Sequence, residues 1–261
     1  MKFKILISFL FLLIISACSK DESGEDNDTD NTVSKVLNRQ TTGSSARDLL
    51  SDNTFTSMII EVVYVEGFEP TESALNNFTT FLENRTYKPN GITVEKRAIP
   101  SPGKTTYSLE DIADIEIEHR THYNTSNQIA VWAYFSDGKS DNDSEENNTV
   151  VLGTAYWNTS FVIYQETVES FSNSPFEPDR TLLETTVINH EFGHILGLTN
   201  LGTPLQSEHE DEEHPKHCDI ENCLMYWASE SAANLSDMAG MSTAPQLDEQ
   251  CIADLQANGG K

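Results

Sequence analysis

The chain has 261 residues, with 42 acidic side chains against 16 lysines and arginines and a formal net charge of -26. This length suits one medium-sized domain with a real hydrophobic core, and a hydrophobic content of 37% excludes a wholly disordered protein. A surface this acidic repels phosphate, which argues against nucleic acid as a partner and against binding to anionic lipid through basic patches.

Residues 1–17 have the pattern of an export signal. Lys2 and Lys4 precede an apolar run, residues 5–15, which is shorter than the roughly 20 residues that a membrane-spanning helix needs. The sequence Ile-Ser-Ala-Cys that ends at Cys18 resembles the lipobox of bacterial lipoproteins, whose cysteine becomes the acylated N-terminus. An ordinary cleaved signal is the alternative. The resemblance implies a lipid anchor at Cys18 and an outer-membrane lipoprotein of the bacterial cell envelope.

Residues 18–52 are predicted to form a disordered acidic tether. Apolar residues are sparse there, and six acids fall within the ten positions 21–30. Such a segment buries too little surface to offset the entropy lost on ordering. An acidic run after a lipidated cysteine resembles the tethers of some lipoproteins on the outer face of Gram-negative cells, so exposure on the cell surface is an expectation.

Residues 53–261 are predicted to form one α+β domain. Runs of β-branched and aromatic residues predict strands at residues 58–65, 92–99, 129–135, 149–156 and 160–165. Amphipathic helices are expected after the capping residues Thr71 and Ser108, and over residues 180–198. Because strands and helices alternate before the strands cluster, we expect a twisted mixed five-stranded sheet packed on helices.

The helix over residues 180–198 carries a metal-binding pattern. His190 and His194 are four residues apart, so their imidazoles stand one turn apart on one face. Two nitrogens at this spacing suit a tetrahedral zinc ion, at about 2.0–2.1 Å from each. Glu191 then points toward the open position of the ion. As general base and then general acid, it takes a proton from a zinc-activated water and passes it to the leaving amine.

Residues 190–226 resemble the metzincin metallopeptidases, whose pattern is H-E-x-x-H-x-x-G-x-x-H followed by a Met-turn. The chain has His-Glu-Phe-Gly-His-Ile-Leu-Gly over residues 190–197, but Asn200 stands where the third histidine belongs. The later run His-Cys-Asp-Ile-Glu-Asn-Cys-Leu-Met-Tyr, residues 217–226, resembles the segment that joins the third ligand to the Met-turn. Its cysteines are closest to archaemetzincins, and its Met-Tyr pair to matrix metalloproteinases.

The resemblance implies a zincin fold with an upper subdomain, residues 53–198, and a lower one, residues 199–261. The lower one holds an acidic insertion, residues 200–216, that is expected to bulge outward before His217 returns to the zinc as third ligand. His209 inside the insertion is the alternative third ligand. Asn200 ranks last, because an amide oxygen is a poor zinc ligand beside imidazole.

Two residues of the Met-turn receive roles from the same resemblance. Met225 is expected to form the hydrophobic floor beneath the metal without binding it. Tyr226 is a candidate for stabilising the transition state through its hydroxyl, and a packed aromatic is the equal alternative.

The cysteines after Cys18 leave two interpretations open. Cys218 and Cys223 lie five positions apart in an exported chain, which favours a short disulfide with Cys251 left over. In archaemetzincins the corresponding pair holds a second, structural zinc together with a later Cys-x-x-Cys. Here that later motif ends in Asp254, so a second zinc site is the imperfect alternative.

Two further segments have candidate roles. The loop Asp137–Glu146 places oxygens at alternate positions, as calcium sites often do, although most such runs are solvated hairpin tips and the full helix-loop-helix pattern is missing. Residues 150–156 resemble the edge strand at the cleft rim of metzincins, where a peptide substrate adds to the sheet. Gly153 within it would allow a close approach of two backbones.

The leading hypothesis is a monomeric, membrane-tethered zinc endopeptidase that acts on peptide or protein substrates. Zinc is the expected cofactor, and calcium is a weaker second expectation. The alternative is a non-catalytic zinc-binding surface lipoprotein that binds a host or cell-wall ligand, which the departure at Asn200 motivates.

Overall fold

The computed structural model describes residues 34–144, 149–172, 174–230 and 238–261, which belong to one compact unit that spans residues 33–261. The export signal, Cys18 and the acidic run of the tether lie outside the described residues. Among the described residues, no helix is both long enough and apolar enough to cross a membrane.

The core of the domain is a five-stranded sheet with the strand order β2-β1-β4-β7-β6. Its strands are β1 (Ser57–Val65), β2 (Ile92–Ile99), β4 (Gln128–Phe135), β6 (Gly153–Trp157) and β7 (Ser160–Ile163). The first four in the order are parallel, whereas β6 runs antiparallel to β7 and forms the edge. The expected mixed five-stranded sheet is therefore confirmed. A separate pair of short strands, β3 (Thr106–Tyr107) and β5 (Lys139–Ser140), lies outside it.

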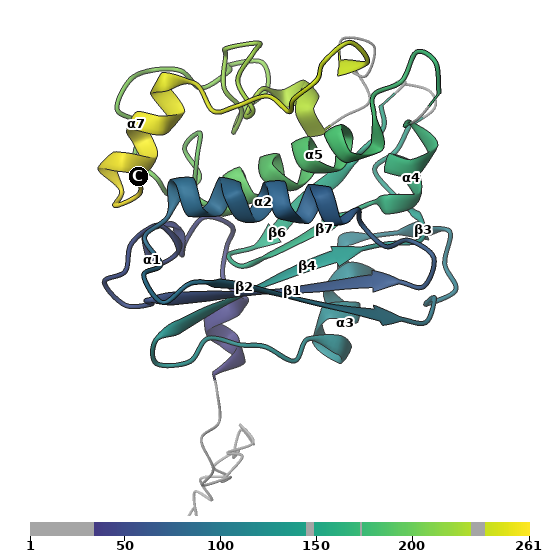
Figure 1. Cartoon of the computed structure of the whole chain (residues 1–261), viewed down its shortest axis with the longest axis horizontal. Coiled ribbons are helices and arrows are strands. Elements are labelled where there is room, and N and C mark those ends of the chain that lie inside the picture. The colour runs from purple at the N-terminus through teal and green to yellow at the C-terminus, as the bar shows by residue number, and fades with distance from the viewer. Residues whose placement is uncertain (1–33, 145–148, 173, 231–237) are drawn as a thin grey trace, which may run out of the picture. The chain divides into compact units, whose positions relative to one another are not determined.

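Helices cover both faces of the sheet. Figure 1 shows α2 (Glu72–Arg85) and α5 (Arg180–Ile195) on one face and α3 (Leu109–His119) on the other. The strands in the middle are buried on both sides, which explains why β1 and β4 read as nearly continuous apolar runs. The remaining helices are η1 (Lys35–Asn38), α1 (Ala46–Leu50), α4 (Gln165–Ser170), η2 (Trp227–Glu230) and α7 (Glu249–Ala257).

Local capping explains where the long helices begin. The side chain of Thr71 accepts a hydrogen bond from the amide of Ala74 at the start of α2. Ser108 and Asp111 form a reciprocal capping box at the start of α3, as their spacing predicts. Each of these bonds satisfies a backbone group that has no partner within its helix.

Helix α5 is the most enclosed helix of the domain. Asp179 caps its first turn, and every residue from Leu182 to Ile195 is buried. The ring of Phe192 packs against Phe78 of α2, with their centroids 5.1 Å apart. Helix α5 ends shortly before Gly197. The φ of Gly197 is 76°, a left-handed conformation that glycine adopts without strain and that turns the chain away from the helix. A helix this deeply buried is a rigid support for the side chains that it carries.

A buried ion pair on the α3 side of the sheet holds edge strand β6 in place. The hydroxyl of Tyr156 in β6 donates to Glu116 of α3 at 2.5 Å. Glu116 also pairs with Arg120 at 2.6 Å, and both side chains are fully buried. Burial raises the pKa of Glu116, although the charge of Arg120 and the hydrogen bonds to the carboxylate act in the other direction. The pair thus holds β6, one of the two edge strands of the sheet.

The predicted tether is too long, because residues 35–50, which were assigned to it, include two helices of the domain, η1 and α1. Leu49 and Leu50 of α1 are fully buried. The amide of Asn38 is also fully buried and donates to Asn124, to the carbonyl of Ala130 and to the hydroxyl of Thr159. The prediction failed because this anchor depends on a polar residue, which carries no hydrophobic signal.

This anchor can be tested by replacing Asn38 with alanine. The change removes buried hydrogen bonds and leaves their partners without a donor, so the free energy of unfolding should fall by about 1–3 kcal/mol. Chemical denaturation of the full chain measures this quantity. The control is Gln40→Ala, because the Gln40 side chain is exposed, and its effect should stay within about 0.5 kcal/mol. Equal and negligible effects of the two changes would mean that residues 34–45 behave as a tether.

Candidate metal centre

Three histidines from two segments of the chain converge at one point. His190 and His194 lie one turn apart on α5, and His217 comes from the loop that follows the insertion. Their candidate ligand nitrogens all lie within 4.8 Å of one another, and the Nε2 atoms of His190 and His194 are 3.1 Å apart. Nitrogens on a tetrahedral zinc ion stand about 3.3 Å apart, given zinc–nitrogen bonds of 2.0–2.1 Å. The three imidazoles therefore fit one shared ion.

Contacts around the histidines fix which nitrogen faces the shared point. Nδ1 of His190 lies 2.7 Å from the carbonyl oxygen of Leu224, a geometry in which Nδ1–H donates and Nε2 keeps its lone pair. His190 is fully buried, and His194 and His217 are only 6% and 9% exposed. A metal held here would be reached from one side only.

Glu191 lies at the bottom of a cleft beside edge strand β6. Its side chain is fully buried, and a Cβ atom added to Gly153 would come within 2.8 Å of Cγ and Oε1 of Glu191. The cleft has a volume of about 210 Å³ and is lined by Thr42, Thr154, Ala155, Glu191, His194, Leu201, Lys216 and His217. The absence of a side chain at Gly153 thus lets the strand lie directly over the carboxylate.

Met225 packs against α5 at Gly193. A Cβ atom on Gly193 would lie 2.2 Å from the sulfur of Met225, so the missing side chain of Gly193 makes room for the methionine. Met225 is fully buried. Tyr226 is half-buried and packs against Trp227, with ring centroids 5.8 Å apart, and it is not among the residues that line the cleft.

Asn200 does not join the histidines. It adopts a left-handed φ of 69°, and its exposed amide donates to Glu210 within the insertion at 3.1 Å. His209 also lies elsewhere, so among the sequence candidates for third ligand only His217 reaches the pair on α5.

The insertion folds back on the domain, whereas the sequence analysis expected it to bulge outward. Glu210 forms an antiparallel bridge with Cys218, and its carboxylate accepts from the amide of Lys216 at 2.8 Å. The hydroxyl of Thr199 donates to the carbonyl of Lys216 and closes the base of the loop. Hydrogen bonds between side chains and nearby backbone groups hold the insertion in this conformation. The acidic charge pattern of the sequence does not reveal such bonds.

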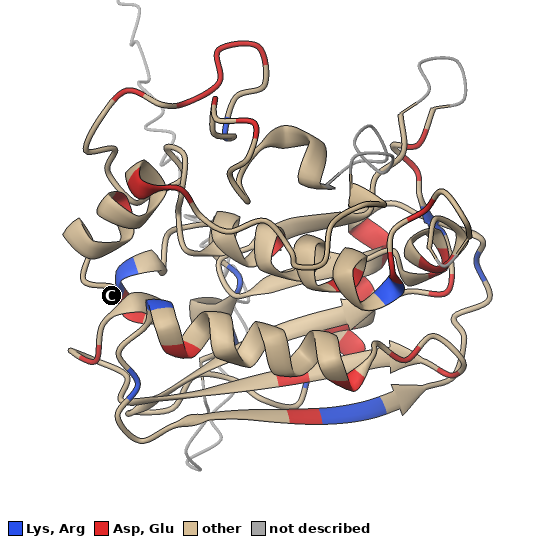
Figure 2. Ribbon diagram, turned by 45° about the horizontal axis from the view of Figure 1, so that its top comes forward, with Lys and Arg blue, Asp and Glu red and all other residues tan. Residues whose placement is uncertain are grey.

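Acidic side chains of the insertion gather around a hollow next to the folded-back loop. Its lining residues are Glu208, Glu210, Asp211, Glu212, Pro215 and Asp219. Figure 2 shows the corresponding loops as long acidic stretches with little positive charge between them. Lys216, in contrast, lines the cleft beside His217, so the cleft wall itself carries a positive charge.

Residues 41–46, which were predicted to belong to the tether, contribute to the cleft. A Cβ atom on Gly43 would lie 1.9 Å from the carbonyl oxygen of Leu201, so this segment packs closely on the turn after α5. Thr42 reaches the cleft and donates to the carbonyl of Ala155 in β6 at 3.5 Å. The composition of the run Thr-Thr-Gly-Ser-Ser, residues 41–45, is typical of a linker. Its glycine, which permits the close packing on Leu201, was the only sequence feature that could have indicated a structural role.

A second cluster forms where the disulfide was expected. Cys218, Cys223 and Cys251 are free, buried thiols, so the predicted Cys218–Cys223 disulfide is wrong for this structure. Sulfur atoms of Cys223 and Cys251 are 3.7 Å apart, and Nδ1 of His209 lies 3.5 Å from the sulfur of Cys218. Hydrogen bonds among the three thiols lower the pKa of Cys223 and raise the pKa of Cys218 and of Cys251.

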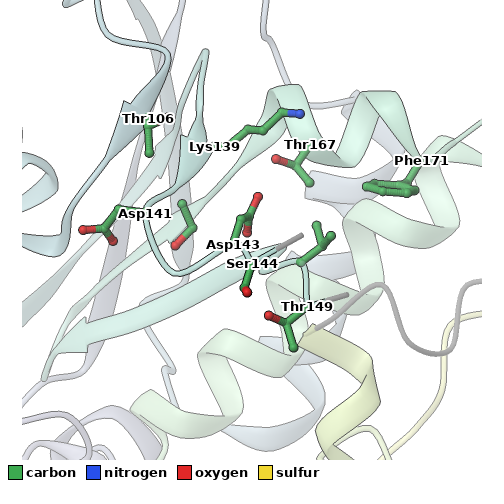
Figure 3. A pocket seen from close by; sticks show the side chains of 10 residues that line it. Thr106, Lys139, Asp141, Asp143, Ser144, Thr149, Thr167 and Phe171 are labelled. Atoms are coloured by element: carbon green, nitrogen blue, oxygen red, sulfur yellow. The ribbon is translucent and has the colours of Figure 1, made fainter. Parts of the chain in front are cut away.

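The proposed calcium loop has no support. Asp137 accepts hydrogen bonds from Tyr107 and Ser101, and Asp143 accepts from the amide of Val151, so both carboxylates hold the loop together. Figure 3 shows the pocket beside them, about 390 Å³ in volume, with Lys139 and hydroxyl groups among its lining side chains. Of the residues that the structure describes, only two groups bring three or more potential metal ligands together, the three histidines and the group of His209, Cys218, Asp248 and Cys251. Glu145 and Glu146 lie outside the described residues.

Comparisons with known proteins agree with the fold. No family model matches the chain, and no curated protein sequence matches it. The solved structure of archaemetzincin from Methanopyrus kandleri is similar, with a TM-score of 0.50 at 18% identity over 78% of this chain and 96% of that protein. Metalloproteinase-II from Bacteroides fragilis gives a TM-score of 0.41 at 14% identity, over 80% of this chain and 56% of that protein. The chain therefore has an archaemetzincin-like zincin fold.

Proposed function

We propose that the chain is a zinc-dependent endopeptidase of the metzincin type. The observation that carries this proposal is the convergence of His190, His194 and His217 on one point beside Glu191, at the base of a cleft that an edge strand borders. The archaemetzincin-like fold supports the same general class of enzyme. His190, His194 and His217 would hold the zinc, which when bound supplies Lewis acidity to the scissile carbonyl and lowers the pKa of water.

Glu191 performs the proton transfers of the proposed reaction. Its carboxylate takes the proton of the attacking water and then delivers it to the nitrogen of the leaving amine. The rigid, enclosed helix α5 holds the carboxylate in place next to the histidines.

Strand β6 is the proposed docking site for the substrate backbone. As the edge strand it has no neighbouring strand on its outer side, so an extended peptide can add to the sheet there. Thr154 and Ala155 of β6 line the cleft directly. Binding through the backbone would position the scissile carbonyl opposite Glu191 and His217.

The alternative is a zinc-binding surface lipoprotein without catalysis. Glu191 argues against it, because a site that only binds a metal has no use for a buried carboxylate at its open side. The first experiment below separates the two functions.

We further propose that the enzyme is tethered to the cell envelope. The lipobox-like sequence that ends at Cys18 and the acidic run after it support an acylated N-terminus followed by a spacer. The spacer would be shorter than residues 18–52, because helices η1 and α1 of the domain lie within that range.

Replacing Glu191 with glutamine should abolish hydrolysis and leave the metal in place. The amide keeps the shape of the side chain but cannot accept the proton, so turnover of an unstructured protein substrate should fall by about 10²–10⁴-fold. Zinc content, measured by atomic absorption on the same samples, should be unchanged. Glu83→Gln, on an exposed position of α2, is the control. Metal-loaded Glu191→Gln protein with undiminished turnover would contradict the proposed role.

Adding one methyl group at Gly153 should displace the carboxylate. The new Cβ would lie 2.8 Å from Glu191 Cγ, and a misplacement of about 1 Å costs on the order of 10²-fold in rate. We expect Gly153→Ala to lower kcat with an unchanged zinc content. Gly240→Ala serves as control, since a Cβ there meets no atom within 4 Å. Full activity of Gly153→Ala would show that the strand does not constrain Glu191.

Cys18→Ser should release the protein from the membrane. Without the thiol no acyl chain can be attached, so the full chain expressed in a Gram-negative host should move from the membrane fraction to the soluble fraction. Labelled fatty acid should be incorporated into the unaltered chain and into the control Ser23→Ala. Retention of Cys18→Ser in the membrane would refute the anchor.

A further inference from the structure

We propose that Lys216 selects substrates that carry an acidic side chain next to the scissile bond. The inference rests on the proposed peptidase function and names a substrate class for it, peptides with aspartate or glutamate beside the bond that is cut. Lys216 directly precedes His217 and lines the cleft with it. Among the described residues that line the cleft, it is the only lysine or arginine, so a substrate carboxylate would find its partner there.

Lys216 and edge strand β6 border the same cleft. Thr154 and Ala155 of β6 line it together with His217 and Lys216. A peptide that adds to β6 therefore passes both of these residues of the loop. Because Lys216 is covalently joined to a proposed metal ligand, the ammonium on its four-carbon stem reaches those substrate side chains that lie close to the bond beside that ligand.

The backbone of Lys216 is strained, and the loop holds it in place. Its φ of 74° is a left-handed conformation that residues other than glycine adopt only against steric repulsion. The amide of Lys216 donates to Glu210 at 2.8 Å, and its carbonyl accepts from the hydroxyl of Thr199, whose own φ is 52°. Strained residues fixed by several bonds cluster at functional sites. Glycine would make this turn without strain, which indicates a role for the lysine side chain.

The insertion before Lys216 is acidic, but its nearest carboxylates are engaged with other groups. Oε1 of Glu210 accepts from the backbone amide of Lys216, and Oε2 accepts from the side chain of Asn200 at 3.1 Å. Asp211 pairs with His214 at 2.9 Å. Among the described residues, no carboxylate forms an ion pair with the ammonium of Lys216, and this side chain is exposed. Its charge is therefore available to a substrate.

The competing role for Lys216 is to act on Glu191, the carboxylate that lines the same cleft. The two roles differ in what a loss of the charge changes. A lysine that acts on Glu191 alters the pH dependence of turnover for every peptide alike. A lysine that binds substrate alters the ratio between acidic and neutral peptides. An unchanged ratio with a shifted pH profile in Lys216→Met would therefore contradict the inference.

Cleavage of a randomised decapeptide mixture by the full chain tests the preference. The mixture holds glutamate, glutamine and lysine in equal amounts at every position, and mass spectrometry of the products gives their frequencies around each cleaved bond. At one of the two positions that flank the bond, glutamate should exceed glutamine by about 5–10-fold, as for a charge-assisted hydrogen bond at a partly exposed site. The assay uses about 0.15 M salt, which screens charges more than about 8 Å apart.

Three variants of Lys216 separate its charge from its shape. Lys216→Met removes the charge, so glutamate and glutamine should become equally frequent at that position. Lys216→Arg keeps the charge and should keep the preference, whereas Lys216→Glu should turn the preference toward lysine. Each ratio is measured within one sample, so it does not depend on how much of a variant folds. Lys139→Met is the matched control, because Lys139 is also exposed but lines a different pocket.

Retention of the same mixture on immobilised Glu191→Gln protein needs no turnover and separates the two proposals. Retained peptides rich in glutamate, without any cleavage by the unaltered chain, would refute the peptidase and keep Lys216 as the group that binds acidic peptides. Cleavage with equal frequencies of glutamate and glutamine would overturn this inference and leave the peptidase intact. A preference for glutamate that persists in Lys216→Met would overturn it too, and neither cleavage nor enrichment would overturn both.

Discussion

The contact between α5 and the loop of residues 217–225 is the constraint on which the rest of the site depends. The carbonyl of Leu224 accepts a hydrogen bond from Nδ1–H of His190. This bond orients the ring so that its Nε2 faces His194 and His217. At Gly193 the sulfur of Met225 occupies the space that any side chain would fill. Because α5 is buried along nearly its whole length, the helix cannot adjust to the loop, and the loop has to fit the helix.

The same loop is the meeting point of the two clusters. His217 faces α5, whereas Cys218 and Cys223 face α7 and the histidine of the insertion. A chain that places its third ligand beyond a long insertion needs a second means of fixing where that ligand returns. The backbone bridge between Glu210 and Cys218 supplies part of this constraint. The acidic side chains of the insertion then line the outside of the loop, away from the ligands.

The sequence predicts most of the fold and the centre of the site because these depend on periodic or closely spaced signals. The five strands follow from apolar runs, and His190, Glu191 and His194 follow from their spacing on one helix. The position of His209 beside the cysteines could not be predicted, because it depends on Asp254, a residue 45 positions away in sequence. Ordered structure at residues 34–51 was missed for a similar reason, since Asn38 is held by polar contacts that no hydrophobicity pattern marks.

A crystal structure of the full chain with anomalous diffraction at the zinc edge tests the central claim most directly. The account predicts an anomalous peak bound by His190, His194 and His217 at the base of the cleft, with Glu191 beside its open side. An empty point between the three histidines, or a zinc ion there that takes His209 or Asn200 as its third ligand, would contradict the account.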